Sequence, residues 1–543
     1  MDKPEPHLLD SPTPEPSARP STAWAADLTS GFLVSLIALP LCLGISMASN
    51  FPPMAGLITA IVGGLVATWI SNSQLTIKGP AAGLIVIALG SVIDLGQGDL
   101  AAGYRLALGV GVVAGALQMT LGLLRLGTIG ELFPTSAVHG MLVAIGVIIA
   151  SKQAYVMLGV SPTSGEPLAL LANLPHALLQ LNPAVAAIGF ASLALLFGLP
   201  AARHTWLRRV PAPIVVLLLS IAAGVGLRFA EPHSYEIFGA SYILGPDLLV
   251  QIADSPLSIF AFPDFSALTS FAGWKYVLMF TLVGSLESLL SAKAIDLLDP
   301  QQRRCDLNRD LVAVGAANTL AALVGGLPMI SEIVRSSANI SNGAQTRRAN
   351  FYHGLFLLAY VALLSPLMQM IPLAALAAML VYTGCRLASI REWVHMAQVG
   401  SEQLAIFLTT LVVTLATDLL VGVGSGIALK IVIHLRSGVP LRAFLRPDLR
   451  IRQESESRHR IWVRDAAIFS NWLRLRQALE DHARPVVLLD LSHAVYVDHT
   501  ALSKLEELRS ELARSGRTLE ILGLAQHSSL STHQLAARRR VAA

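Results

Sequence analysis

The chain has few charged and aromatic residues for its length. Charged residues make up 14% and aromatic residues 6% of its 543 positions, whereas apolar residues reach 54%. Ordinary soluble domains carry roughly 25% charged residues, so this composition excludes a chain that is soluble throughout. The net charge of +4 says little by itself, because Lys and Arg cluster in particular loops, and we expect no nucleic-acid partner.

Cysteine and catalytic motifs are also scarce. Cys42, Cys305 and Cys385 are scattered, which excludes a disulfide framework and gives no metal-ligand spacing. The sequence has no nucleophile–base set, no phosphate-binding glycine loop and no metal-ligand cluster. We therefore expect neither an enzyme nor an ATP-driven pump, and no cofactor.

The chain has instead a series of apolar runs of about 20 residues between positions 31 and 434, the pattern of a membrane protein with many helical spans. We predict an all-α polytopic membrane domain over residues 28–437, with fourteen segments arranged as a seven-plus-seven inverted repeat. The segments are predicted to begin near Leu28, Pro53, Gly79, Leu106, Thr135, Pro183, Pro213, Gly273, Asp310, Ile330, Asn350, Ile371, Glu402 and Leu420.

The third and tenth of these segments are broken at matching places. Gly79-Pro80 breaks the third, and Gly325-Gly326-Leu327-Pro328 precedes the tenth. Paired breaks in the two halves of a membrane protein mark half-helices at a transport site. The N-terminus of each half-helix presents unpaired N–H groups and a partial positive charge, and both attract anions. The breaks therefore predict a small-anion site between the two half-helices.

Four charged residues fall near the middle of the predicted membrane layer, namely Lys78, Glu287, Glu332 and Arg335. Each charge costs about 2.5–3.5 kcal/mol there on insertion scales, so such residues are functional by default. The alternative is a mutual ionic network that only joins the two halves. Glu287 lies among apolar and small residues and is predicted to bind a coupling sodium ion or proton. Arg335 cannot lose its proton and is the predicted fixed charge of the anion site.

The roles of Lys78 and Glu332 stay open. Lys78 either faces the substrate or neutralises an acid, and Glu332 either faces the site or caps its own helix. The four side chains sum to zero and the two half-helix ends add about +0.5 each, so a pocket near +1 would suit a monovalent anion. The predicted substrate-binding residues are Lys78, Gly79, Ala81, Ala82, Gly83, Ser331, Glu332, Ile333 and Arg335.

Composition changes at both ends of the chain. Residues 1–27 are rich in Pro, Ser and acids and are predicted to form a disordered cytoplasmic tail. Residues 438–460 are predicted to be a charged linker that attracts acidic lipid heads. Residues 461–530 alternate strands and helices and predict a small α/β domain, followed by a tail at 531–543. Basic residues gather in alternate loops, which predicts a multi-pass protein of a cell (inner) membrane with both termini cytoplasmic.

Several motifs also resemble a known family. They are Leu39-Pro40 with residues 44–48 and 51–57, Lys78-Gly79-Pro80, residues 308–318 leading into 325–328, and residues 335–339 with 343–347. Together they are similar to the sulfate permease (SulP) family of anion transporters. The resemblance spans residues 29–523 and implies a core domain, a gate domain and a C-terminal STAS domain, matched at residues 490–492 and 497–502. It also implies a homodimer, a cytoplasmic partner for the STAS domain, and functional roles for Arg335 and Glu287.

The chain departs from the family pattern in its substrate region. Leu41 stands where the family usually has Gln, Lys78 replaces a small residue and Glu332 is unusual, so sulfate is not to be assumed. In related bacterial regulators a phosphorylated Ser follows the STAS Asp. Here His499 holds that place, and we interpret residues 498–500 as a helix cap.

These observations predict a secondary active transporter that carries a small inorganic oxyanion by alternating access, coupled to sodium or protons. Bicarbonate is slightly preferred and sulfate is next. Three alternatives stay open. The first is a nucleobase carrier of the same architecture, and the second is a dicarboxylate carrier. The third is an anion channel or a membrane-anchored regulator that works through its STAS domain.

Overall fold

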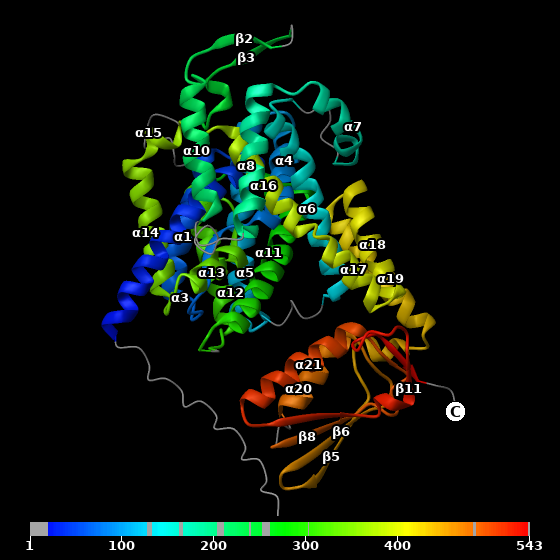
Figure 1. The fold of residues 1–543 in the computed structure, drawn as a ribbon. Coiled ribbons are helices and arrows are strands. Elements are labelled where there is room, and N and C mark those ends of the chain that lie inside the picture. The colour runs from blue at the N-terminus through cyan, green and yellow to red at the C-terminus, as the bar shows by residue number, and fades with distance from the viewer. Residues whose placement is uncertain are drawn as a thin grey trace, which may run out of the picture.

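The computed structural model places a helical membrane domain next to a smaller α/β domain at the C-terminus (Figure 1). The structure describes residues 20–127, 133–161, 167–202, 211–237, 240–251, 261–301, 303–481 and 485–540. The first nineteen residues of the predicted N-terminal tail and the last three of the chain lie outside these ranges.

The membrane domain is almost entirely helical. Among the described residues, eight helical stretches are long and apolar enough to cross a membrane. The seven-plus-seven repeat stays a prediction. The helices are α1 (Pro20–Ala48), α2 (Pro53–Val62), continued by a π-helical turn (Gly63–Ala67) and α3 (Thr68–Ile70), α4 (Ile85–Gly96), α5 (Leu100–Leu123), α6 (Thr135–Leu158), α7 (Pro167–Leu179), α8 (Pro183–Ala201), α10 (Ala212–Gly226), α11 (Phe271–Leu298), α12 (Leu307–Leu323), α13 (Ile333–Ser341), α14 (Arg348–Leu363), α15 (Ser365–Met368), α16 (Leu373–Leu387), α17 (Ile390–Val399), α18 (Ser401–Ala416) and α19 (Leu419–Arg436).

Two helices begin earlier than the sequence predicted. The Asp99 side chain accepts from the N–H groups of Ala101 and Ala102, so α5 is capped at Leu100 rather than at Leu106. Helix α1 begins at Pro20, so residues 20–27 are helical and not part of a disordered tail. The Asp27 carboxylate anchors this stretch by accepting from the N–H groups of residues 345 and 346 at 2.7 and 2.9 Å.

Close approach of small residues holds the helices together. Gly115 of α5 faces Gly315 of α12, and a Cβ at either position would overlap the backbone of the other helix. Gly146 of α6 and Gly384 of α16 meet in the same way. Packing through small residues is how helices associate in a lipid environment, where apolar burial gives little driving force.

The C-terminal domain contains two four-stranded sheets. One has the order β10 (Thr518–Leu522), β8 (Val486–Asp490), β6 (Arg458–Val463), β5 (Leu449–Ser455), and only the β5–β6 pair is antiparallel. The other has the order β11 (His527–Ser529), β12 (Arg538–Arg540), β9 (Tyr496–Val497), β7 (Ala466–Ala467). Helices α20 (Trp472–Asp481) and α21 (His499–Arg514) pack with the first sheet around an apolar core. This agrees in outline with the predicted alternation of strands and helices.

Two predicted irregular segments at the borders of this domain are partly strands. The charged linker expected at 438–460 contains β5 and the start of β6, and the tail expected at 531–543 contains β12. Strand β5 lies at the sheet edge, on the side away from the membrane domain (Figure 1). The Arg-rich stretch from Leu449 onward therefore belongs to the folded domain, because its main-chain groups pair with β6.

Candidate functional site

The two broken segments meet in the structure, as the sequence predicted. The residues before the half-helices form short strands, β1 (Ile77–Pro80) and β4 (Met329–Glu332), which pair antiparallel with Lys78 opposite Ser331. The Ala81 N–H adds a bond to the Pro328 carbonyl at 3.3 Å. We call this strand pair the half-helix crossing. Helix α4, preceded by a 3₁₀ turn (Ala82–Leu84), follows β1, and α13 follows β4. Both helix N-termini thus start from one small region.

Arg335 lies in the first turn of α13, and its side chain is only 1% exposed. Its guanidinium packs against Gly79 of β1, where a Cβ would overlap Nη1. Nε and Nη1 have no hydrogen-bond partner among the described residues. A buried donor without a partner costs about 1–3 kcal/mol, so these atoms indicate a place for an acceptor that the chain does not itself supply.

Two carboxylates reach the same crossing. Glu287 of α11 is 7% exposed and lies against Gly83, whose missing Cβ leaves room for the carboxylate oxygens. Neither oxygen of Glu287, nor Oε1 of Glu332, has a hydrogen-bond partner among the described residues. Glu332 occupies the N-cap position of α13 but makes no capping bond with its side chain. The capping role considered for Glu332 is therefore wrong, and its carboxylate is left near Glu287 and Arg335.

Lys78, the fourth predicted charged residue, forms an ion pair with Asp310 and not with the other three. Its Nζ donates to Asp310 Oδ1 of α12 and to Ser331 Oγ, both at 2.6 Å, and the side chain is 1% exposed. The four predicted charges therefore do not form one mutual network, because Lys78 pairs with an acid outside the set. Asp310 is the partner of Lys78 that sequence reasoning missed, although an acid in the first turn of an apolar helix was a usable signal.

Some of the predicted backbone donors are already engaged. The N–H of Ala81 donates to Pro328, and the N–H of Ser331 donates to Ser288 Oγ at 3.1 Å. The Ala82 N–H donates to the Glu332 carboxylate, so the predicted anion donors narrow to Gly83, Glu332 and Ile333.

Two further polar side chains near Arg335 were not predicted. Cys42 of α1 is fully buried and its thiol contacts the guanidinium. His353 of α14 is also fully buried, and neither of its ring nitrogens has a hydrogen-bond partner among the described residues. A histidine in an apolar segment was the available signal for this position.

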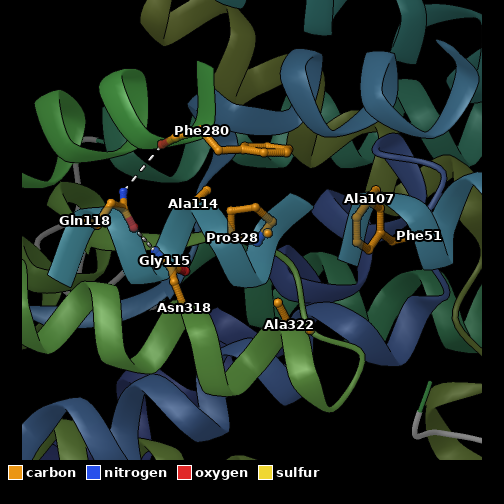
Figure 2. Close-up of a pocket in the computed structure, with 11 residues that line it drawn as sticks. Phe51, Ala107, Ala114, Gly115, Gln118, Phe280, Asn318, Ala322 and Pro328 are labelled. Carbon is orange, nitrogen blue, oxygen red and sulfur yellow. Dashed lines mark hydrogen bonds between the residues drawn. The ribbon is translucent and has the colours of Figure 1, made fainter. Parts of the chain in front are cut away.

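A neighbouring pocket of about 320 Å³ lies beyond β4 and is separate from the charged crossing. Its lining includes none of the four predicted charged residues. Figure 2 shows Gln118 bridging to Asn318 and to the Phe280 carbonyl, with Pro328 on the pocket wall. The Asn318 amide in turn donates to the Met329 carbonyl and accepts from the Met329 N–H at 3.1 and 2.6 Å. The pocket therefore lies beside the Gln118 and Asn318 side chains that hold β4 in place, and not beside the charged residues of the site.

The region where β1 and β4 cross thus contains both hydrogen-bond donors and hydrogen-bond acceptors that have no partner among the described residues. The guanidinium of Arg335 offers donors, and the carboxylates of Glu287 and Glu332 offer acceptors. Helix N-termini add partial positive charge. The arrangement can hold an oxyanion on Arg335 if a proton or cation accompanies it on the carboxylate side.

Comparison with known proteins points to one family. The sulfate permease family profile matches residues 24–410. The putative sulfate transporter YvdB of Bacillus subtilis is 26% identical over 509 residues, which are 92% of this chain and 91% of that protein. The bicarbonate transporter BicA of Picosynechococcus is 24% identical over 407 residues, which are 74% of this chain and 68% of that protein.

Solved structures show the same fold. The transmembrane domain of a cyanobacterial bicarbonate transporter BicA matches with a TM-score of 0.62 at 22% identity, covering 74% of this chain and 97% of that one. The murine Slc26a9 anion transporter in its inward-facing state matches with a TM-score of 0.65 at 15% identity, covering 93% and 86%. Since the family match alone covers well over half of the sequence, this chain belongs to the sulfate permease family.

Proposed function

We propose that the chain is a secondary active transporter of a small inorganic oxyanion, coupled to sodium or protons and working by alternating access. The observation that carries the proposal is the buried guanidinium of Arg335 facing the same crossing as the carboxylate of Glu287, both with unpartnered polar atoms. A transported ion must leave its water shell and find replacement partners at mid-membrane. Unpartnered buried groups at the tips of paired half-helices provide such partners.

The charges at the crossing favour cotransport with a cation. Lys78 and Asp310 cancel each other, so Arg335, Glu287 and Glu332 leave a net side-chain charge of −1. The two half-helix ends add about +0.5 each, so the pocket is near neutral rather than near +1. A proton or sodium ion on a carboxylate makes the pocket positive and prepares it for one monovalent anion.

Among oxyanions, bicarbonate suits this pocket better than sulfate. Its carboxylate end can accept hydrogen bonds from Arg335, and its hydroxyl can donate one to Glu332 or Glu287. Sulfate offers acceptors only and carries two negative charges beside two carboxylates. The names of the relatives include both a bicarbonate and a sulfate transporter, so both substrates belong in the test.

In the proposed mechanism each residue has a defined part. Arg335 and the N–H groups at the starts of α4 and α13 hold the anion, and Glu287 binds the coupling ion. The core domain carries the paired tips past the gate domain to the other side of the membrane. We assign the C-terminal α/β domain as a cytoplasmic STAS domain that binds a regulatory partner or a second subunit of a homodimer.

The test is uptake of labelled bicarbonate and sulfate into proteoliposomes under an imposed sodium or proton gradient. We expect saturable uptake with counterflow, stronger for bicarbonate and accelerated by one of the two gradients. Labelled uracil and succinate test the nucleobase and dicarboxylate alternatives. Electrodiffusive current without counterflow would identify a channel instead, and no flux for any of these solutes would favour a regulator.

A further inference from the structure

The ion pair between Lys78 and Asp310 is the most deeply buried charged contact at the half-helix crossing. Lys78 Nζ lies 2.6 Å from Asp310 Oδ1, and the two side chains are 1% and 0% exposed. Lys78 belongs to β1, and Asp310 belongs to the first turn of α12. The pair therefore connects the first half-helix to an element of the second half of the membrane domain.

Hydroxyl groups extend the pair to the second half-helix and to α11. Ser331 Oγ of β4 accepts from Lys78 Nζ and donates to Asp310 Oδ2 at 3.1 Å. Ser288 is the neighbour of Glu287 on α11, and its Oγ donates to Ser331 Oγ at 3.2 Å and accepts from the Ser331 N–H at 3.1 Å. Ser71 Oγ completes the shell of Asp310 at 2.6 Å.

Each charged group of this cluster has hydrogen-bond partners within the cluster. Lys78 Nζ has two acceptors, and both oxygens of Asp310 are bonded. This contrasts with Arg335 Nε and Nη1 and both Glu287 oxygens, for which the described residues provide no hydrogen-bond partner. The crossing thus has one saturated side, which fixes the two strands, and one unsaturated side, which faces the ligand.

We propose that Asp310 is a positioning residue that holds the Lys78 ammonium away from the transported anion and locks the two half-helix tips into one rigid unit. The inference rests on the proposed function for its transport readout. In this proposal Lys78 binds Asp310 and does not bind the transported anion. A rigid pair of tips keeps Arg335 and the helix N-termini at a constant spacing while the core domain moves.

Paired neutralisation tests this assignment. Lys78→Met and Asp310→Asn each leave the other charge buried and uncompensated, so both variants should melt at a clearly lower temperature in detergent. The double variant Lys78→Met/Asp310→Asn removes both charges and should recover most of that loss. Losses that simply add in the double variant would overturn the inference.

Transport kinetics separate positioning from substrate binding. The double variant should keep the anion KM within about threefold of wild type while kcat falls, because the Lys78–Ser331 bond that fixes the tips is gone. Arg335→Ala, measured alongside, should raise KM at least about tenfold. A double variant whose KM rises as much as that of Arg335→Ala would make Lys78 a substrate ligand and refute the inference. If wild-type protein carries no anion, the proposed function fails, and the melting temperatures alone decide whether the pair locks the tips.

Discussion

Arg335 and Glu287 reach the half-helix crossing from different helices, α13 and α11, and both are buried at a depth where charge is expensive. Arg335 Nε and Nη1 and both Glu287 oxygens have no hydrogen-bond partner within the described part of the chain, whereas Lys78 and Asp310 bond to each other and to Ser331. Residue type alone does not distinguish these two situations. The difference lies in what each side chain meets in the fold.

Removal of the Arg335 guanidinium should weaken anion binding more than folding. We expect Arg335→Ala to raise the anion KM by roughly 10- to 100-fold, because charge-assisted hydrogen bonds contribute about 1.5–3 kcal/mol. Arg335→Lys keeps the charge but loses the planar guanidinium, so its KM should lie between those of the wild type and Arg335→Ala. Saturation curves of proteoliposome uptake measure this. An unchanged KM in Arg335→Ala would remove the residue from the site.

Glu287→Gln should abolish coupling. The amide keeps the shape of the side chain but neither titrates nor carries the charge that attracts a cation. Uptake driven by the effective gradient should drop to the level seen without a gradient, while exchange at equal anion concentrations persists. Full gradient-driven uptake in this variant would show that the coupling ion binds elsewhere.

At the scale of elements, the segment of the first half-helix depends on glycines that leave space for charged side chains. A Cβ on Gly83 would overlap the Glu287 carboxylate, and a Cβ on Gly79 would overlap the Arg335 guanidinium. The first broken segment therefore presents bare backbone to the charged side chains of α11 and α13. The glycines at this break therefore end the regular helix and also make room for the charged side chains of the site.

Gly83→Ala should disturb transport without unfolding the protein. The new methyl group meets the end of a flexible side chain and not backbone, so Glu287 can move aside at small cost in stability. We expect the melting temperature to change little and gradient-driven uptake to fall severalfold. Gly198→Ala in α8 is the matched control, because nothing lies within 4 Å of its added Cβ. Equal uptake in the two variants would contradict this account of Gly83.

At the scale of the whole molecule, a buried ion pair joins the two domains. Lys430 of α19 lies 3.2 Å from Asp498, the N-cap of α21, and both side chains are fully buried. Lys430 also donates to Thr500 at 2.7 Å, and Tyr496 donates to Glu402 of α18 at the same distance. The predicted cap at residues 498–500 is confirmed, since Asp498 accepts from the Ala501 N–H. The cap also connects the domain to the last membrane helices.

Asp498→Asn should loosen this connection. Asparagine is as good an N-cap as aspartate, so α21 keeps its start, but Lys430 is left as a buried charge without its counter-ion. Breaking one side of such a pair costs about 3–5 kcal/mol. We expect faster hydrogen exchange in α21 and easier proteolysis near residue 438 than in the exposed control Asp481→Asn. Identical exchange in both variants would contradict a domain-joining role.

Acid should weaken the C-terminal domain near this contact. Burial lowers the pKa of His499 below its ordinary value of 6.5, so the folded domain disfavours the proton that the unfolded chain accepts. The stabilisation is therefore complete above about pH 6.5 and is lost as the pH falls. Burial opposes the ionisation of Asp498, but Lys430 and nearby N–H donors keep its pKa below 3.8, so its own contribution is lost only in stronger acid. Thermal unfolding between pH 5 and pH 7 should show a slope that His499→Gln reduces.

The C-terminal boundary shows why composition misleads at domain edges. Most residues of β5 are exposed and many are charged, so the strand has the composition of a linker. Edge strands use charged residues to avoid pairing with other chains, and this pattern is not distinguishable from an irregular segment without its partner β6. Residues 20–27 were wrongly predicted to be disordered for a related reason. The hydrogen bonds of Asp27 to residues 345 and 346 join segments far apart in the chain, so local composition does not reveal them.

The sequence by itself determined the membrane domain, the two half-helices and the identity of the charges near them, because apolar runs and proline or glycine breaks act locally on the backbone. Only the tertiary structure decided which charges stay unpartnered. Asp310 lies 232 positions from Lys78, and packing brought these two within ion-pair distance while it left Arg335 and Glu287 open. Long-range packing therefore gave Lys78 an ion-pair partner and left Arg335, Glu287 and Glu332 around a site with room for an ion.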